Sequence, residues 1–297
     1  MEFLIHLLQG LINGMSPGAT YAIIAIGYTM VYGIAKMLNF AHGDVIMVGC
    51  YAVVLTVATL TDPLWGVLVA VLLAVILCTL LGVTMEKVAY KPLRGAPSLS
   101  VLITAIGISY LLQSVAEFFF TDSLPPKTAA IVGRLTFGPF SIDYYTLLTI
   151  GLAAVIMVGL TLFIKFSRPG RAMVAVSEDR DAARLMGINT DAIITLTFAI
   201  GSALAAIAGW LMLTKGTYTI STTGALPGIM AFSAAVIGGI GSIPGAMVGG
   251  VLLGLIEGVV VAFNLDPFVT PIQFALLIVV LLFKPAGLLG KARREKV

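Results

Sequence analysis

The stretch that decides the fold is Leu64–Glu86, "LWGVLVAVLLAVILCTLLGVTME", which has no charged side chain before its last residue. A helix that crosses the hydrocarbon core of a bilayer needs about 20 mostly apolar residues, and this stretch supplies them. Across the 297 residues, 59% of side chains are hydrophobic and only 10% are charged, whereas soluble domains carry about a quarter charged residues. We therefore expect an all-α polytopic membrane protein.

Nine segments are candidates for membrane helices. Segment 228–241 is too short to cross comfortably, so we expect a half-helix or a tilted, re-entrant segment inside the protein, where irregular backbone is tolerated. Pro17 in the first segment predicts a kink or a break. Residues 1–297 are expected to form one membrane domain with about 8–9 transmembrane segments. The candidates are 4–33, 42–61, 64–86, 98–120, 144–164, 191–213, 228–241, 246–263 and 268–284.

Basic residues are concentrated in a few connections between these segments. Fourteen of the seventeen Lys and Arg residues lie at Lys36 or in segments 87–97, 165–190 and 284–297. Such an excess marks the cytoplasmic side of a membrane protein. We therefore expect these connections and the C-terminus to be cytoplasmic and, after nine crossings, the N-terminus to lie outside. The loop 121–143 is then extracytoplasmic, and its turn-rich sequence predicts a small cap or hairpin.

The connection 165–190 is polar and contains the pattern of a short surface helix. Ser177 is expected to cap this helix, with acidic residues in the following turn, and Gly187 to end it. Ala182 and Ala183 would offer a flat surface to a partner protein, with arginines at its rim. A plain connection between two spans is the alternative interpretation. The candidate docking residues are Ser177, Glu178, Arg180, Asp181, Ala182, Ala183, Arg184 and Gly187.

Asn39, His42 and Asp44 are an unusual polar group in an otherwise almost uncharged region. Asn39 is expected to cap the second membrane helix, with His42 and Asp44 in or near its first turn, where an acidic side chain favours the positive helix end. Gly43 leaves room for a neighbouring backbone. Two interpretations remain open: a capped helix start packed inside the protein, or a polar entrance that lines a path through the membrane or its gate.

Glu257 is the other candidate, since apolar residues surround it on both sides. A charged carboxylate at the bilayer centre costs roughly 2.5–3.5 kcal/mol on insertion scales, so the side chain should face protein, water or a partner. It either lies on a path or a subunit interface, or is a hydrogen-bonded packing residue. Further along, the glycine-rich stretch 238–250 predicts a helix–turn–helix, which either packs closely through Gly245 and Gly249 or moves during gating.

Several kinds of site do not fit the sequence. No G-x-x-x-x-G-K-[ST] motif occurs, so no Walker-type nucleotide site is expected. The two histidines are too few for a multi-histidine metal site, and Cys50 and Cys78 lie in apolar runs without metal-ligand spacing. No catalytic residue, metal ligand or cofactor is therefore expected in this chain. A secondary carrier should show more ionisable residues inside the membrane, and an enzyme would need an acidic and histidine cluster, to which only 39–44 comes close.

Three motifs, in this order, resemble those of one transporter family. The chain is similar over nearly its whole length to the LivH-like permeases of bacterial ABC importers for branched-chain amino acids, and the similarity is weakest in 121–143. "DAA…G", from Asp181 to Gly187, resembles the EAA loop of such permeases, although Asp181 replaces the usual Glu and no I-x-L-P follows. The motifs are "GATYAIIAIGYTMVYGIAKMLNFAHGDVIMVGCY" (18–51), "RPGRAMVAVSEDRDAARLMGINTDAIITLTFAIGSALAAIAG" (168–209) and "AFSAAVIGGIGSIPGAMVGG" (231–250).

The resemblance implies a division of labour in the inner membrane. The chain would pair with a second, LivM-like permease, and its helix in 165–190 would couple it to two ATPases similar to LivG and LivF, which bind ATP and Mg²⁺. A periplasmic binding protein would deliver leucine, isoleucine or valine, lipid would surround the spans, and no nucleic acid is expected as a partner. The preferred substrate stays open, because related permeases handle other amino acids or urea, and so does pairing between two copies of this chain.

Overall fold

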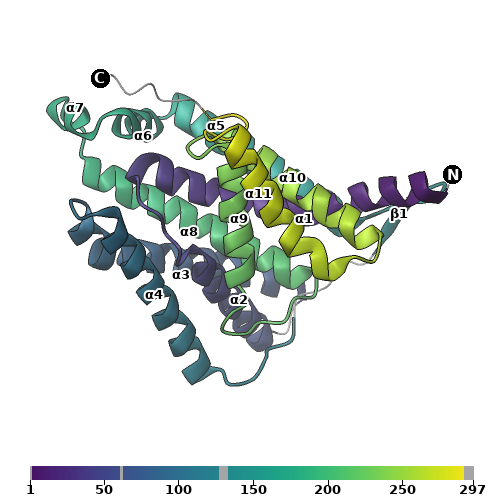
Figure 1. The fold of residues 1–297 in the computed structure, drawn as a ribbon. Coiled ribbons are helices and arrows are strands. Elements are labelled where there is room, and N and C mark those ends of the chain that lie inside the picture. The colour runs from purple at the N-terminus through teal and green to yellow at the C-terminus, as the bar shows by residue number, and fades with distance from the viewer. Residues whose placement is uncertain (1, 61–62, 127–132, 291–297) are drawn as a thin grey trace. The chain divides into compact units, whose positions relative to one another are not determined.

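The computed structural model describes residues 2–60, 63–126 and 133–290 and is mainly helical (Figure 1). Within these residues, eight helices are long and apolar enough to cross a membrane, which confirms the expected all-α polytopic fold. They are α1 (Glu2–Ala35), α2 (His42–Thr59), α3 (Pro63–Met85), α4 (Ser98–Phe119), α5 (Tyr144–Phe166), α8 (Thr190–Thr214), α10 (Ile243–Ala262) and α11 (Val269–Phe283), and the short helices η1 (Glu86–Tyr90), η2 (Lys91–Leu93) and η3 (Asp266–Phe268) extend two of these spans.

Two expectations about the helices have different outcomes. The short segment is a helix of 14 residues, α9 (Ala225–Gly238), which at 1.5 Å per residue is about 21 Å long and so shorter than a bilayer core. The expected break at Pro17 does not occur, because α1 is one continuous helix of 34 residues. A proline removes one backbone hydrogen bond but is tolerated inside membrane helices, and Gly14 and Gly18 on both sides of Pro17 pack directly against α10.

The described residues form two compact units. The first contains the described residues of Met1–Thr29, Val132–Val158 and Met230–Val297. The second contains those of Met30–Ile131 and Gly159–Ile229.

Two glycine series hold α1 against α10 in the first unit. A Cβ atom added at Gly254 would lie 2.5 Å from the carbonyl oxygen of Gly14, and one at Gly10 would lie 2.8 Å from that of Gly258. Backbones approach this closely only where side chains are absent, as in small-xxx-small contacts between membrane helices. The series are Gly10, Gly14 and Gly18 on α1 and Gly250, Gly254 and Gly258 on α10.

The predicted helix–turn–helix in 238–250 is confirmed. α9 ends at Gly238, and α10 begins after Ser242, whose hydroxyl accepts a hydrogen bond from Gly245 N. A Cβ atom at Gly249 would lie 2.9 Å from Gly238 N, so this glycine step is a packing contact. The chain after α11 returns to the same turn, since Leu288 N donates to the carbonyl of Ile237 at 2.8 Å.

The loop 121–143 contains the predicted hairpin, although its residues 127–132 lie outside the described residues. β1 (Arg134–Phe137) pairs antiparallel with β2 (Phe140–Asp143). The amide of Gln9 on α1 joins the hairpin, because its Nε2 donates to Ser141 O at 2.8 Å and its Oε1 accepts from Ser141 N at 2.9 Å. Gln9 therefore ties the hairpin to α1 within the first unit.

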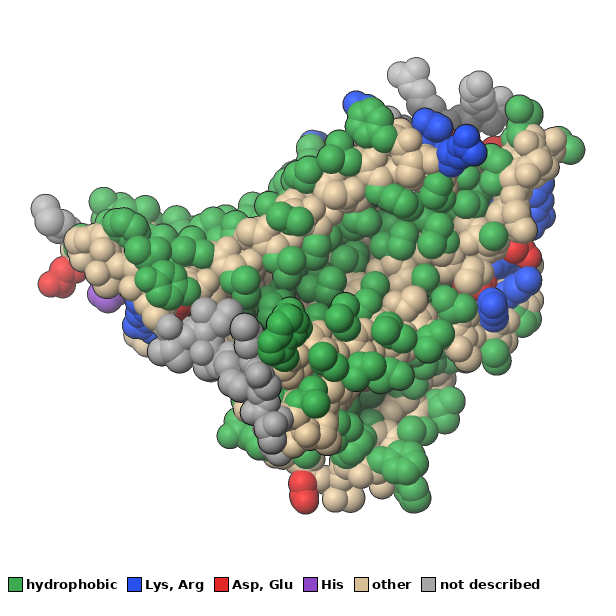
Figure 2. Space-filling view, turned by 180° about the vertical axis from the view of Figure 1, so that it is seen from behind, with side chains coloured by type: hydrophobic (Ala, Val, Ile, Leu, Met, Phe, Trp, Pro, Cys, Tyr) green, Lys and Arg blue, Asp and Glu red, His purple; other side chains and the backbone are tan. Residues whose placement is uncertain are grey.

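The core of the second unit is formed by α2, α3 and α8. A Cβ atom at Gly49 would lie 3.0 Å from the Cα of Ala206, and one at Gly209 would lie 2.9 Å from the carbonyl oxygen of Ile46. Hydrophobic side chains cover most of the face shown in Figure 2. In both units, large apolar side chains on the spanning helices are exposed, which fits contact with lipid. Examples are Leu72 and Ile103 in the second unit and Val155 and Leu282 in the first.

Candidate functional site

The helix expected in 165–190 is in fact two short helices, α6 (Arg168–Glu178) and α7 (Arg180–Leu185), which lie near the first turns of α8 (Figure 1). The prediction that Ser177 caps a helix is wrong. Ser167 is the N-cap of α6, and its hydroxyl accepts a hydrogen bond from Gly170 N at 2.9 Å. Because that cap and the following proline start the helix further upstream, Ser177 falls in the last turn, where its hydroxyl donates to Val174 O.

Asp179 separates the two helices and caps the second. Its backbone is extended, with φ −151° and ψ 115°, which ends α6 at the exposed Glu178. The carboxylate of Asp179 accepts hydrogen bonds from the backbone N–H groups of Asp181 and Ala182, at 2.9 and 3.0 Å. Acidic residues therefore do lie at the positive end of a helix, Asp179 as the cap of α7 and Asp181 in its first turn.

The end of α7 has the predicted glycine. Gly187 has φ +80°, its N–H donates to Arg184 O, and the next N–H, that of Ile188, donates to Ala183 O. These two bonds form a Schellman motif. The alanine pair does not form one flat surface, because adjacent helical residues point in different directions: Ala183 is buried and Ala182 is exposed.

Two large apolar side chains are exposed at this helix end. Leu185 is 90% exposed and Met186 is 82% exposed. Neither belongs to a candidate membrane span. The sequence reasoning missed both residues, because it considered only polar and small residues as docking contacts.

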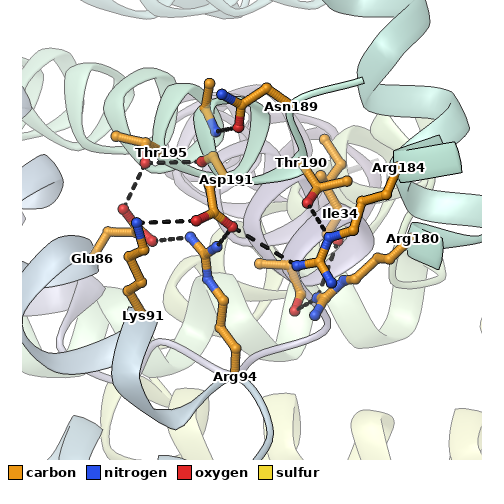
Figure 3. Close-up of polar contacts among 12 residues, drawn as sticks. Ile34, Glu86, Lys91, Arg94, Arg180, Arg184, Asn189, Thr190, Asp191 and Thr195 are labelled. Atoms are coloured by element: carbon orange, nitrogen blue, oxygen red, sulfur yellow. Dashed lines mark hydrogen bonds and ion pairs between the residues drawn. The ribbon is translucent and has the colours of Figure 1, made fainter. Parts of the chain in front are cut away.

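A cluster of charges ties the start of α8 to the turn after α3 (Figure 3). Arg94 bridges two carboxylates, those of Glu86 and Asp191. Glu86 has no exposed side-chain surface, and its second oxygen accepts a hydrogen bond from Thr195 Oγ1 at 2.7 Å. Lys91 Nζ lies 3.0 Å from Asp191 Oδ2. The buried carboxylate is therefore paired and hydrogen-bonded, as buried charges must be.

The two arginines of α7 have separate anchors. Arg184 Nε donates to Thr190 Oγ1 at 2.9 Å, and its Nη2 lies 3.9 Å from Asp191 Oδ1. Arg180 Nη2 instead donates to the carbonyl of Ala35, at the end of α1, so it is half-buried rather than the rim contact expected. Burial, and then the neighbouring guanidinium groups of Arg94 and Arg184, lower the pKa of Arg180 from its ordinary value.

The stretch around Asn39 connects α1 to α2. The prediction that Asn39 caps α2 is wrong, because the backbone N–H of His42 donates to Asn39 O and so places a turn between Asn39 and the helix. The cap position is held by Ala41, without a side-chain hydrogen bond. Asn39 Oδ1 instead accepts a hydrogen bond from the hydroxyl of Tyr90 at 2.8 Å, and both side chains are buried.

His42 and Asp44 do lie in the first turn of α2, as predicted, and are 1% and 2% exposed. Asp44 Oδ1 accepts a hydrogen bond from Gln113 Nε2 of α4 at 2.8 Å. A Cβ atom at Gly43 would lie 2.5 Å from Gly224 O, which confirms that this glycine makes room for a neighbouring backbone.

Glu257 lies on α10 in the first unit and is half-buried. Its Oε2 accepts hydrogen bonds from the hydroxyl of Tyr21 at 2.8 Å and from Gln273 Nε2 at 3.4 Å. The carboxylate thus joins α1, α10 and α11. The other candidate residues all lie in the second unit, where the ends of α1, α3, α7 and α8 come together.

The sequence reasoning also missed Glu86, Arg94 and Asp191. A signal was available, because Glu86 stands at the end of a long apolar stretch and is followed closely by three basic residues, Lys87, Lys91 and Arg94. Its partner Asp191 could not be identified, since it lies far away along the chain. In the part of the chain that the structure describes, no group of three or more His, Cys, Asp and Glu side chains could hold a metal ion.

Comparison with known proteins assigns the chain to a family. Residues 10–283 match the family described as "Branched-chain amino acid transport system / permease component". The chain belongs to this family. It is 44% identical to the permease protein BraD of the high-affinity branched-chain amino acid transport system of Pseudomonas aeruginosa, with 100% of both chains covered. It is also 42% identical to LivH of Escherichia coli, with 100% of this chain and 99% of LivH covered.

Family membership confirms the resemblance seen in the sequence motifs. LivH of Salmonella typhimurium is similarly related, at 43% identity over 100% of this chain and 99% of that protein. Together with the apolar helices, these relatives make this chain a multi-pass membrane permease.

Proposed function

We propose that this chain is the permease subunit of an ATP-driven ABC importer that carries leucine, isoleucine and valine across the bacterial inner membrane. The observation that carries this proposal is the similarity over the full length to BraD and LivH, at 42–44% identity. A match limited to one domain would not indicate which subunits assemble with this chain. The match extends over all spans and the connections between them, which supports the same separation into permease and ATPase subunits. ATP hydrolysis then belongs to partner subunits.

The charges support one orientation of the second unit. Lys91, Arg94, Arg180 and Arg184 gather at one end of it, where the turn after α3, α7 and the start of α8 meet. The positive-inside rule places this end in the cytoplasm. The bridge between Leu124 and Thr219 would then lie on the outer side. The C-terminus is proposed to be cytoplasmic, although residues 291–297 lie outside the described residues.

The exposed end of α7 fits a docking contact with an ATPase. Leu185 and Met186 are apolar, lie outside the candidate spans and stand beside a charged cluster. Exposed apolar patches rimmed by polar residues mark interaction sites, and two adjacent large apolar side chains are the start of such a patch. We propose that they enter a groove of the ATPase subunit, and that Asp181, Ala182 and Gly187 shape the helix that presents them.

Transport would follow from movement of this helix. When the ATPase pair closes around ATP, α6 and α7 move with it, and the attached spans switch between outward and inward access. Asn39, His42 and Asp44, together with Glu257, are proposed to line or control the path. The hydrogen bonds of Asp44 and Glu257 also fit a packing role. For these two carboxylates, the test is a substitution by the amide, which keeps a hydrogen-bond acceptor but removes the charge.

Reconstitution tests the proposed function. The chain is purified with its native partners, placed in proteoliposomes, and assayed for uptake of labelled leucine with and without ATP and the binding protein. We expect two associated ATPase subunits, and ATP hydrolysis that rises with leucine-loaded binding protein. A chain that purifies alone and transports leucine without ATP is a secondary carrier, and the proposal then fails.

A double substitution tests docking by α7. Leu185→Ala with Met186→Ala should reduce the amount of co-purified ATPase at least tenfold, since loss of hot-spot contacts costs about 2 kcal/mol or more. The matched control is Ile278→Ala, which shortens an exposed apolar side chain on the membrane span α11 and should leave ATPase binding unchanged. Equal ATPase recovery in both variants would place the docking contact elsewhere.

A further inference from the structure

The last carbonyl groups of α1 are bound by a residue from a distant part of the chain. A helix ends with carbonyls that have no partner inside the helix and carry partial negative charge. Arg180 Nη2 donates to two of them, the carbonyls of Ile34 and Ala35. A charged donor makes hydrogen bonds roughly twice as strong as neutral ones, so Arg180 is a strong side-chain link from α7 to α1.

The chain beyond these carbonyls leads to the polar start of α2. Lys36 has φ +53° and ends α1. After it, Met37, Asn39 and Ala41 are buried without belonging to a helix. The burial of these residues shows that this non-helical segment is packed inside the protein. A displacement of Ala35 would therefore move the segment that positions His42 and Asp44.

The second arginine of α7 holds a different element. Arg184 binds Thr190 and Asp191 at the start of α8, and Asp191 is itself held by Arg94 on the fully buried Glu86 (Figure 3). Arg184 thus attaches α7 to an ion-pair network whose innermost carboxylate, that of Glu86, is buried. Arg180 attaches it to a helix end that continues into non-helical backbone. The Arg184 contact can therefore hold α7 at the start of α8, while the Arg180 contact transmits a movement of α7 to the end of α1.

We propose that Arg180 is a positioning residue that transmits the movement of α7 to the end of α1 and to the segment 36–41. This inference rests on the proposed function, because it requires α7 to be moved by an ATPase. It predicts that removal of Arg180 separates ATP hydrolysis from transport without removing the ATPase, whose contacts lie at the opposite, exposed end of α7 around Leu185 and Met186.

The test is the number of leucine molecules imported for each ATP hydrolysed, in proteoliposomes that contain the complete complex and the binding protein. In Arg180→Ala, this ratio should fall by roughly tenfold, within the range of coupling energies between sites, while ATPase remains bound. Arg180→Lys keeps the charge but not the planar fork, and should give an intermediate ratio. Arg171→Ala is the matched control, since Arg171 is exposed on α6 and its guanidinium donates to the nearby Phe166 O.

Parallel losses of transport and ATP hydrolysis in Arg180→Ala, at an unchanged ratio, would show a merely structural role and overturn the inference. If Arg180→Ala does not assemble, Arg180→Lys decides: a ratio equal to that of the unsubstituted complex overturns the inference, and a lowered ratio supports it. An unsubstituted complex that imports leucine without ATP contradicts the proposed function itself, so the two failures are distinguishable.

Discussion

Replacing Gly254 by Ala should destabilise the protein by forcing α1 and α10 apart. The added Cβ atom would lie 2.5 Å from the carbonyl oxygen of Gly14 and closer still to the backbone of Gly18. Ordinary van der Waals contact begins near 3.4 Å, and backbone atoms cannot rotate away as a side chain can. The two helices would therefore have to separate along their whole glycine contact.

The sign of this effect is opposite to that of helix propensity. Ala is favoured over Gly inside a helix by about 0.8–1 kcal/mol, whereas overpacking typically costs about 1–3 kcal/mol. Since the clash involves backbone on two residues of α1, we expect the upper part of that range and a net loss of about 1–2 kcal/mol. Gly151→Ala is the matched control: Gly151 lies on α5 in the same unit, and an added Cβ atom there meets nothing within 4 Å.

The assay is thermal unfolding in detergent, followed by far-ultraviolet circular dichroism. Gly254→Ala should lower the midpoint temperature, and Gly151→Ala should leave it unchanged or raise it. Equal midpoints for the two variants would show that α1 and α10 do not meet through their glycines, and the packing described for the first unit would be wrong.

Three further substitutions test other parts of the account. Arg94→Ala leaves the buried carboxylate of Glu86 without its ion pair, which should lower the free energy of unfolding by about 3–5 kcal/mol. Adding Glu86→Gln should restore part of the lost thermal stability. A double variant that is no more stable than Arg94→Ala would contradict the pairing. In Gly187→Val, the backbone at position 187 must keep φ +80°, which costs a β-branched residue about 1–2 kcal/mol. Less ATPase should therefore co-purify with Gly187→Val than with Gly187→Asn. Equal amounts of co-purified ATPase would show that the left-handed backbone at this position is not required. Asp44→Asn keeps an oxygen for Gln113 and should assemble normally but import leucine more slowly; unchanged uptake would make Asp44 a packing residue.

The spans could be predicted because each depends on local composition alone. Leu64–Glu86 is apolar enough to require lipid whatever surrounds it, and the structure places α3 there. Gly187 was predictable for the same reason, since a glycine after a short helix is a local signal for its end. The glycine series of α1 and α10 are also visible in the sequence as four-residue repeats, but that the two pack on each other is a tertiary fact.

Two of the wrong predictions concern caps, which depend on competition between neighbouring residues. Ser177 and Asn39 are both good capping residues, yet Ser167 and Asp179 determine where α6 and α7 begin, and Asn39 is held by Tyr90. The partners in these contacts lie up to tens of residues away. The roles of Ser177, Glu178 and Glu257 in coupling or transport stay predictions.

The most direct test of the central claim is leucine uptake by the reconstituted complex with its binding protein, measured with ATP and with a non-hydrolysable analogue. The account predicts uptake against a gradient only with ATP, and loss of that uptake when Leu185 and Met186 are both replaced by Ala. Uptake of the same size with the analogue, or by this chain alone, would contradict it.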